Sequence, residues 1–168
     1  MADSARVTDD AAAFNALVGH LEYSMFIVTA RAGDERLGCL VGFAAQTSID
    51  PPRFLVCLSH ANRTYRRGHD TGVLGVHCVP ADAEDLAELF GGQTGDEVDK
   101  FARCAWHDGP GGVPIIERCQ NWFVGHVINR IQAGDHDAFL LEPIAAQAGE
   151  QEDFTFHRAK RIEPGHPA

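Results

Sequence analysis

The sequence has 168 residues, a length that suits one compact domain with a single core. Its 24 Asp and Glu residues outnumber 14 Lys and Arg residues and give a net charge of −10, which excludes nucleic acid and anionic membrane surfaces as main partners. No apolar run approaches the roughly 20 residues of a membrane-spanning helix, and the polar segment 1–10 lacks the pattern of a secretory signal peptide, so we expect a cytoplasmic protein.

The first predicted element is a helix that begins at Thr8 or Asp9 and ends at Gly19 and His20. It carries one apolar stripe at helical spacing, formed by Phe14, Leu17, Val18 and Leu21. We expect this helix to cover one end of a β-barrel.

Closely spaced strand signals follow, rich in β-branched and aromatic residues and separated by turn residues. The predicted strands are 24–31, 37–48, 53–59 and 73–79. The pair Pro51-Pro52 ends the second strand and opens the third, where the first residue of a strand needs no ladder donor.

The second half of the chain begins with a predicted helix whose N-cap is Asp82 and which stops at Gly91-Gly92. Its apolar stripe consists of Leu86, Leu89 and Phe90. After it we expect a short helix over 96–101, a loop over 109–114, a hairpin of strands 122–130 and 138–146, and a last strand over 154–162.

Six or seven short strands with few helices between them favour a mainly antiparallel barrel over a parallel sheet. The domain is expected to span 12–162, between a flexible segment, 1–11, and a loose tail, 163–168. The five cysteines are scattered and odd in number, which indicates reduced thiols in the core. Cys104 and His107 lack a second ligand pair, so no metal site is expected.

The segment 38–52 is a long, mostly uncharged strand with several small residues. One interpretation is a buried strand without a further role. The other is that its backbone approaches a flat ligand, most closely at Gly42, which has no Cβ. No G-x-G-x-x-G, P-loop or G-x-S-x-G motif occurs in the sequence, so a cofactor would be held by other means.

The segment 59–67 is the dense basic patch of this acidic chain. Arg63 can hold a phosphate with two hydrogen bonds, and Asn62 and Thr64 add donors at the start of a helical turn. The alternative is a solvated loop paired with surface carboxylates. If the patch binds a cofactor phosphate, Arg63 and Gly42 must border the same cavity.

A tight turn, Gly134-Asp135-His136, separates the two strands of the predicted hairpin. In one interpretation His136 simply faces water. In the other it lies at the mouth of the barrel beside a redox ligand, where a histidine can donate a proton near neutral pH.

These segments, in this order, resemble the flavin reductase family with its FMN-binding split β-barrel. The resemblance covers residues 12–162. The matching residues are Gly38, Val41, Ser48, Asp50-Pro51-Pro52, Asn62-Arg63-Thr64, Asp85-Leu-Ala-Glu-Leu-Phe90, Asp99-Lys-Phe101 and Gly134-Asp-His136. The implied fold is mainly β, an antiparallel split β-barrel with a few flanking helices.

The resemblance also implies a site. FMN, with FAD as the alternative, would contact Leu40, Val41, Gly42, Phe43, Ala44 and Ser48 with its ring, and Asn62, Arg63, Thr64, Phe90 and Gly91 near its phosphate. The nicotinamide of NADH or NADPH would meet Gly134, Asp135, His157 and Arg158, with His136 as the catalytic residue. A homodimer is implied, as is an oxygenase component that receives reduced flavin.

The sequence departs from the family pattern in two places. The usual Thr-Val-Ser-Ser is Leu40-Val41-Gly42-Phe43 here, and the usual Tyr-Arg-Gly-x-Tyr is Phe156-His-Arg-Ala-Lys160. Two other functions therefore stay open. One is a split-barrel enzyme that reduces another substrate with flavin or deazaflavin, and the other is a non-catalytic flavin or haem carrier.

Overall fold

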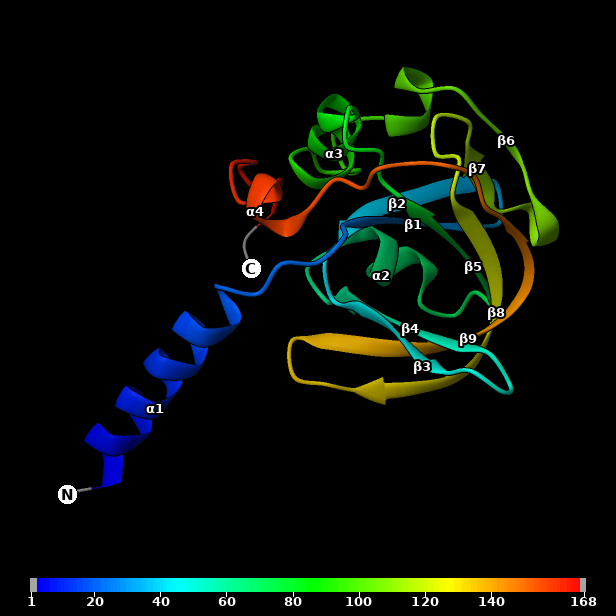
Figure 1. Cartoon of the computed structure of the whole chain (residues 1–168). Coiled ribbons are helices and arrows are strands. Elements are labelled where there is room, and N and C mark those ends of the chain that lie inside the picture. Colours follow the sequence, from blue (N-terminus) through cyan, green and yellow to red (C-terminus); the bar gives the residue numbers. More distant parts are fainter. Residues whose placement is uncertain (1–2, 167–168) are drawn as a thin grey trace.

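A computed structural model describes residues 3–166, and its central feature is a curved sheet of seven strands in the order β2-β1-β5-β8-β9-β4-β3 (Figure 1). All neighbouring strands pair antiparallel. The strands are β1 (Phe26–Ala32), β2 (Glu35–Val41), β3 (Ala44–Ser48), β4 (Arg53–Ser59), β5 (Val73–Cys78), β8 (Trp122–Gln132) and β9 (His136–Gln147). A separate antiparallel pair consists of β6 (Trp106–Asp108) and β7 (Pro114–Ile116). The predicted mainly β, antiparallel fold class is confirmed.

The predicted strand 37–48 is wrong in one respect, because it forms two strands that break at Gly42 and Phe43. β2 and β3 lie at opposite ends of the strand order, although only these two residues connect them. The carbonyl of Phe43 accepts a hydrogen bond of 2.9 Å from the N–H of Cys57 in β4. The two edges of the sheet therefore meet at this break, and glycine suits such a bend because it weakens a continuous strand.

Three helices, α2 (Arg63–Gly68), α3 (Glu84–Gly91) and α4 (Phe156–Ala159), lie beside or inside the curved sheet, whereas α1 (Asp3–Val18) projects away from it (Figure 1). The 3-10 turns are η1 (Lys100–Arg103) and η2 (Pro110–Gly112). α2 packs against β1, β2 and β4, and α3 packs against β2. The predicted N-cap Asp82 is wrong, because α3 starts after Ala83 and no side chain caps it.

The predicted last strand, 154–162, is also wrong. Only isolated bridges form there, between Ser24 and Thr155 and between Pro80 and Asp153, and the chain then turns into α4. The N–H of Phe156 donates to the carbonyl of Tyr23, and the next hydrogen bonds are local, from Ala159 to Thr155 and from Lys160 to Phe156.

The helix α1 starts earlier than predicted, at Asp3, and leaves the rest of the molecule (Figure 1). Phe14, Leu17 and Leu21 are 62%, 60% and 51% exposed. The prediction that this helix covers an end of its own barrel is therefore wrong. None of the helices within residues 3–166 has the length and apolar character needed to cross a membrane.

The side chains of β1 contribute to two hydrophobic cores, because successive side chains of a strand point to opposite faces of the sheet. Val28 belongs to a core between the strands, with Val56, Leu74 and Phe139, whereas Ile27 belongs to a core around α3. All five cysteines are free, and Cys39 and Cys119 are buried, as the expectation of core thiols requires.

A buried histidine joins three strands. His77 in β5 is fully buried, its Nδ1–H donates to the carbonyl of Ile27 in β1 at 3.0 Å, and its Nε2 accepts from the N–H of Ile116 in β7 at 3.2 Å. Burial lowers the pKa of His77 to about 4, so the ring is neutral at physiological pH.

Candidate functional site

A cleft of about 500 Å³ opens where β2 ends and β3 begins. The segment 39–43 forms one wall, with Cys57 and Ser59 of β4 beside it. β4 contributes only the small side chains of Cys57 and Ser59 to the cleft, because Val56 and Leu58, the strand neighbours of Cys57, point into the core. The volume lies within the usual range for small-molecule sites.

An aromatic pair forms another part of the cleft. Tyr23 and Phe156 stack with ring centroids 4.6 Å apart and planes 14° apart, and both line the cleft. Together with Met25, they give a flat, apolar surface of the kind that a planar ring system contacts.

No carboxylate of the described residues lines this cleft, although the chain has 24 Asp and Glu residues. The titratable nitrogen groups in the lining are Lys160, His136 and His166. The cleft is thus a locally neutral to positive region of a strongly negative protein, and it favours an anionic ligand.

His136, at the start of β9, lines the cleft and is oriented by its neighbour. Its Nδ1 lies 2.7 Å from Oδ1 of Asp135, and this hydrogen bond lowers the pKa of Asp135. The His136 ring also packs against Phe43, with centroids 5.2 Å apart. Phe43 is 57% exposed, so the pair forms part of the rim. His136 is therefore a rim residue of the cleft and does not simply face water.

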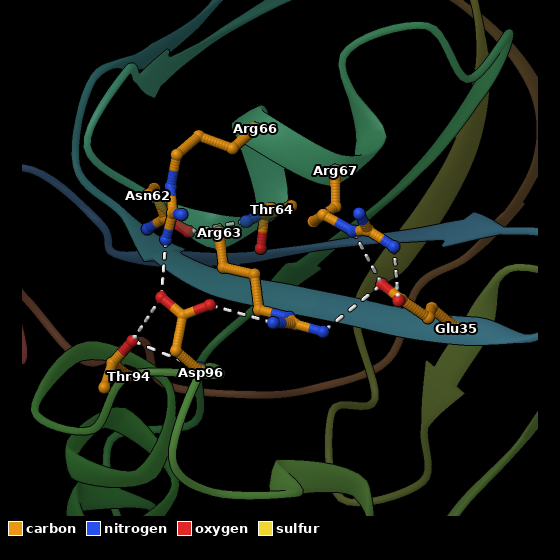
Figure 2. Close-up of polar contacts among 8 residues, drawn as sticks. All are labelled: Glu35, Asn62, Arg63, Thr64, Arg66, Arg67, Thr94 and Asp96. Carbon is orange, nitrogen blue, oxygen red and sulfur yellow. Dashed lines mark hydrogen bonds and ion pairs between the residues drawn. The ribbon is translucent and has the colours of Figure 1, made fainter.

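The arginines of the basic segment 59–67 all form ion pairs with carboxylates (Figure 2). Arg63 contacts Asp96 at 2.8 Å and Glu35 at 3.3 Å, Arg66 contacts Asp96, and Arg67 contacts Glu35 at 2.7 Å. Hydrogen bonds from Arg67 and Arg63 lower the pKa of Glu35 and of Asp96, respectively. This arrangement matches the alternative in which the patch pairs with surface carboxylates.

Arg63 lines a second cavity of about 320 Å³ rather than the cleft that Gly42 lines. The expectation that these two residues border the same cavity is therefore wrong. The two hollows have one lining residue in common, Asn62, whose side chain accepts from the N–H of Thr64 at 2.9 Å. Five carboxylates line the second cavity: Asp34, Glu35, Asp96, Glu97 and Asp99.

The other predicted site residues divide into two groups. The cleft brings together Leu40, Val41, Gly42, Phe43, Asn62, Gly91 and His136. The structure does not bring to it Ala44, Ser48, Arg63, Thr64, Phe90, Gly134, Asp135, His157 and Arg158. Gly134 instead provides the left-handed turn residue of the hairpin, with φ of 95°.

The predicted nicotinamide contacts His157 and Arg158 both face away from the cleft. His157 pairs with Glu22 at 2.7 Å, and Arg158 with Glu84 at 3.3 Å. Because this segment is helical, residues three and four positions apart share a face. Phe156, Ala159 and Lys160 therefore line the cleft, and these residues were missed. Reading 155–160 with helical spacing would have found them.

The residues of the cleft fit a flavin. A tricyclic ring requires a flat, largely apolar surface, which the Tyr23–Phe156 pair and the segment 39–43 offer. The anionic side chain of the cofactor requires donors, which Asn62 and Lys160 offer in a cleft whose described lining contains no carboxylate.

Comparison with known proteins agrees with this assignment. A family model described as the flavin reductase like domain matches residues 18–164. The FMN reductase (NADH) RutF of Ancylobacter novellus is 29% identical over 132 residues, which cover 79% of this chain and 72% of that protein. A reductase component of a 4-nitrophenol 4-monooxygenase/4-nitrocatechol 2-monooxygenase from Rhodococcus opacus is 26% identical over 151 residues, 90% of this chain and 80% of that one.

Solved structures show the same fold. The NADH:FAD oxidoreductase of Streptomyces globisporus superposes with a TM-score of 0.79 at 24% identity, covering 88% of this chain and 89% of that one. A flavin reductase domain protein from an Arthrobacter species gives a TM-score of 0.79 at 22% identity, covering 94% and 95%. Since the family model spans most of the sequence, the chain belongs to the family of flavin reductase like domains.

Proposed function

We propose that this protein is an NAD(P)H-dependent flavin reductase that binds FMN, with FAD as the alternative, in the cleft beside residues 39–43. The observation that carries the proposal is a cleft of about 500 Å³ that no described carboxylate lines, in a member of the flavin reductase like family. The relatives named FMN reductase (NADH) support FMN and NADH.

Residues 39–43 and the aromatic pair would hold the flavin ring, and Asn62, where the cleft adjoins the second cavity, would hold the side chain of the cofactor. Bound flavin would supply the redox chemistry, as the acceptor of the hydride, one proton with two electrons, that oxidises the reduced nicotinamide to its pyridinium form. The protein's task is to bind both rings and hold them face to face.

His136 is the proposed catalytic residue, and Asp135 is a positioning residue that acts through it. The hydrogen bond to Asp135 keeps the proton of the neutral ring on Nδ1 and directs Nε2 to the other side. From there His136 orients the nicotinamide or donates a proton to the reduced flavin.

The His136→Ala substitution is expected to lower the turnover of NADH oxidation with FMN by about a hundredfold. The affinity for FMN, measured by quenching of flavin fluorescence, is expected to stay nearly constant because the aromatic pair and 39–43 remain. Asp135→Asn, which keeps His136, should give a smaller loss. Unchanged turnover in His136→Ala would contradict the role of this residue.

Reduced flavin is then passed on, and we propose an oxygenase component as the acceptor. The support is the relative in Rhodococcus opacus, which is named as the reductase component of a monooxygenase. We also place the reaction in the cytoplasm, where five free thiols stay reduced.

A homodimer is proposed on the basis of α1. This helix carries exposed apolar side chains at Phe14 and Leu17 and projects away from its own domain (Figure 1). A single helix of 16 residues is marginally stable in water. Packing against a second copy of the chain would bury the stripe in an isologous interface.

Light scattering of the wild-type protein is expected to give twice the 18.2 kDa of one chain. The double substitution Phe14→Asp with Leu17→Asp should give the mass of a single chain, because two carboxylates cannot be buried in an apolar interface. Ala16→Asp, on the opposite side of α1, is the matched control and should remain dimeric. A wild-type monomer would contradict the proposal.

A further inference from the structure

Lys160 is the only Lys or Arg residue in the described lining of the cleft. It follows directly after α4, and the helical spacing that places Phe156 in the cleft also places Lys160 there. Its Nζ donates a hydrogen bond to the carbonyl of Gly19 and lies 4.8 Å from the centroid of the Phe156 ring. These two contacts hold the ammonium group at one position of the wall.

The charge of Lys160 is not neutralised by the protein. Within residues 10–166, no carboxylate forms an ion pair with it, whereas Arg63, Arg66 and Arg67 are all paired with Glu35 or Asp96. An ammonium group has three donors, and the carbonyl of Gly19 uses one of them. Two donors remain for a ligand.

We propose that Lys160 binds the phosphate of the nucleotide held in the cleft, the role that the sequence suggested for Arg63. The proposal rests on the proposed function. Arg63 shares its charge between two carboxylates, in a cavity where five acidic residues outnumber Arg36, Arg63 and Lys100, so it offers less net attraction to a phosphate. The cleft around Lys160 has no described acidic residue, so no carboxylate of its lining offsets the positive charge.

Two ligands could supply this phosphate: the flavin, through its 5′-phosphate, and the nicotinamide dinucleotide, through its pyrophosphate. Both phosphates offer the same chemistry to an ammonium group. The experiment therefore compares each ligand with its phosphate-free counterpart, FMN with riboflavin and NADH with reduced nicotinamide riboside.

The test measures the affinity of purified wild type, Lys160→Met and Arg63→Met for all four ligands, by flavin fluorescence and by calorimetry. Methionine keeps an unbranched stem over Phe156 while it removes the charge. We expect Lys160→Met to lower the affinity for FMN, or for NADH, by about tenfold, and to leave the affinity for the phosphate-free counterpart nearly unchanged. The difference should shrink in about 1 M salt, where the Debye length is about 3 Å. Lys160→Arg should restore most of the affinity, and Arg63→Met should behave like wild type.

The ligand whose affinity falls selectively identifies the source of the phosphate. A loss of affinity for FMN alone assigns the flavin phosphate, and a loss of affinity for NADH alone assigns the pyrophosphate of the dinucleotide. Equal weakening of both members of each pair, no weakening at all, or a selective loss in Arg63→Met would overturn the proposal. A wild-type protein that binds none of the four ligands would overturn the proposed function itself, and the two failures are thereby distinguished. Thermal unfolding of each variant reports any loss of fold.

Discussion

Replacing Cys57 with tryptophan is expected to lower the affinity for FMN by about a hundredfold or more, equivalent to about 2.7 kcal/mol. Cys57 lines the cleft from β4, while Val56 and Leu58 on either side of it belong to the core. An indole at this position therefore projects into the space that the flavin ring requires. Fluorescence quenching of FMN on the purified variant measures the effect.

The matched control is Cys57→Ser, which has nearly the same shape and should bind FMN like the wild-type protein. The tryptophan variant should keep most of its thermal stability, because Cys57 is only half-buried. If Cys57→Trp bound FMN as tightly as Cys57→Ser, the flavin ring would lie elsewhere, and the assignment of this cleft would fail.

His77→Leu is expected to reduce the free energy of unfolding by about 3 kcal/mol, because it removes two buried hydrogen bonds to backbone groups. The ring no longer donates to the carbonyl of Ile27, and the buried N–H of Ile116 loses its acceptor. Urea unfolding at neutral pH measures the loss. The cleft should remain intact in the folded fraction, since His77 does not line it.

The same histidine predicts a pH dependence. Its pKa is about 4 in the folded protein against 6.5 for an ordinary histidine, so the unfolded chain binds the proton more tightly. Stability from this group is fully present above pH 6.5 and is lost as the pH falls from there toward 4, by up to about 3 kcal/mol. The difference in unfolding free energy between wild type and His77→Leu should therefore narrow over this range. A constant difference would contradict the neutral, buried ring.

Local patterns predicted much of the fold because they act within a few residues. The strands 53–59 and 73–79 follow from β-branched residues bounded by turns, and the structure places β4 and β5 there. The Gly134-Asp135-His136 turn was predictable for the same reason, and with it the position of His136 at one end of β9. The walls of the cleft at Leu40, Gly42 and His136 were thus within reach of sequence analysis.

Long-range contacts decided the parts that sequence analysis missed. Nothing near Arg63 in the chain indicates that Glu35 and Asp96 will neutralise it, and that pairing is why the proposed phosphate contact is another residue. Residues 154–162 contain Phe and Ile like a strand, but only isolated bridges form at this segment and Phe156–Ala159 is helical. The face of that helix then decides that Lys160, and not His157, lines the cleft.

The proposed function requires a flavin in the cleft that accepts hydride from a reduced nicotinamide. Its most direct test is the visible spectrum of the purified protein with FMN, recorded without oxygen before and after NADH is added. We predict that the flavin absorption bands disappear on addition of NADH, much faster than for FMN without protein. Flavin bands that persist with NADH, or a strong Soret band of haem in the purified protein, would contradict it.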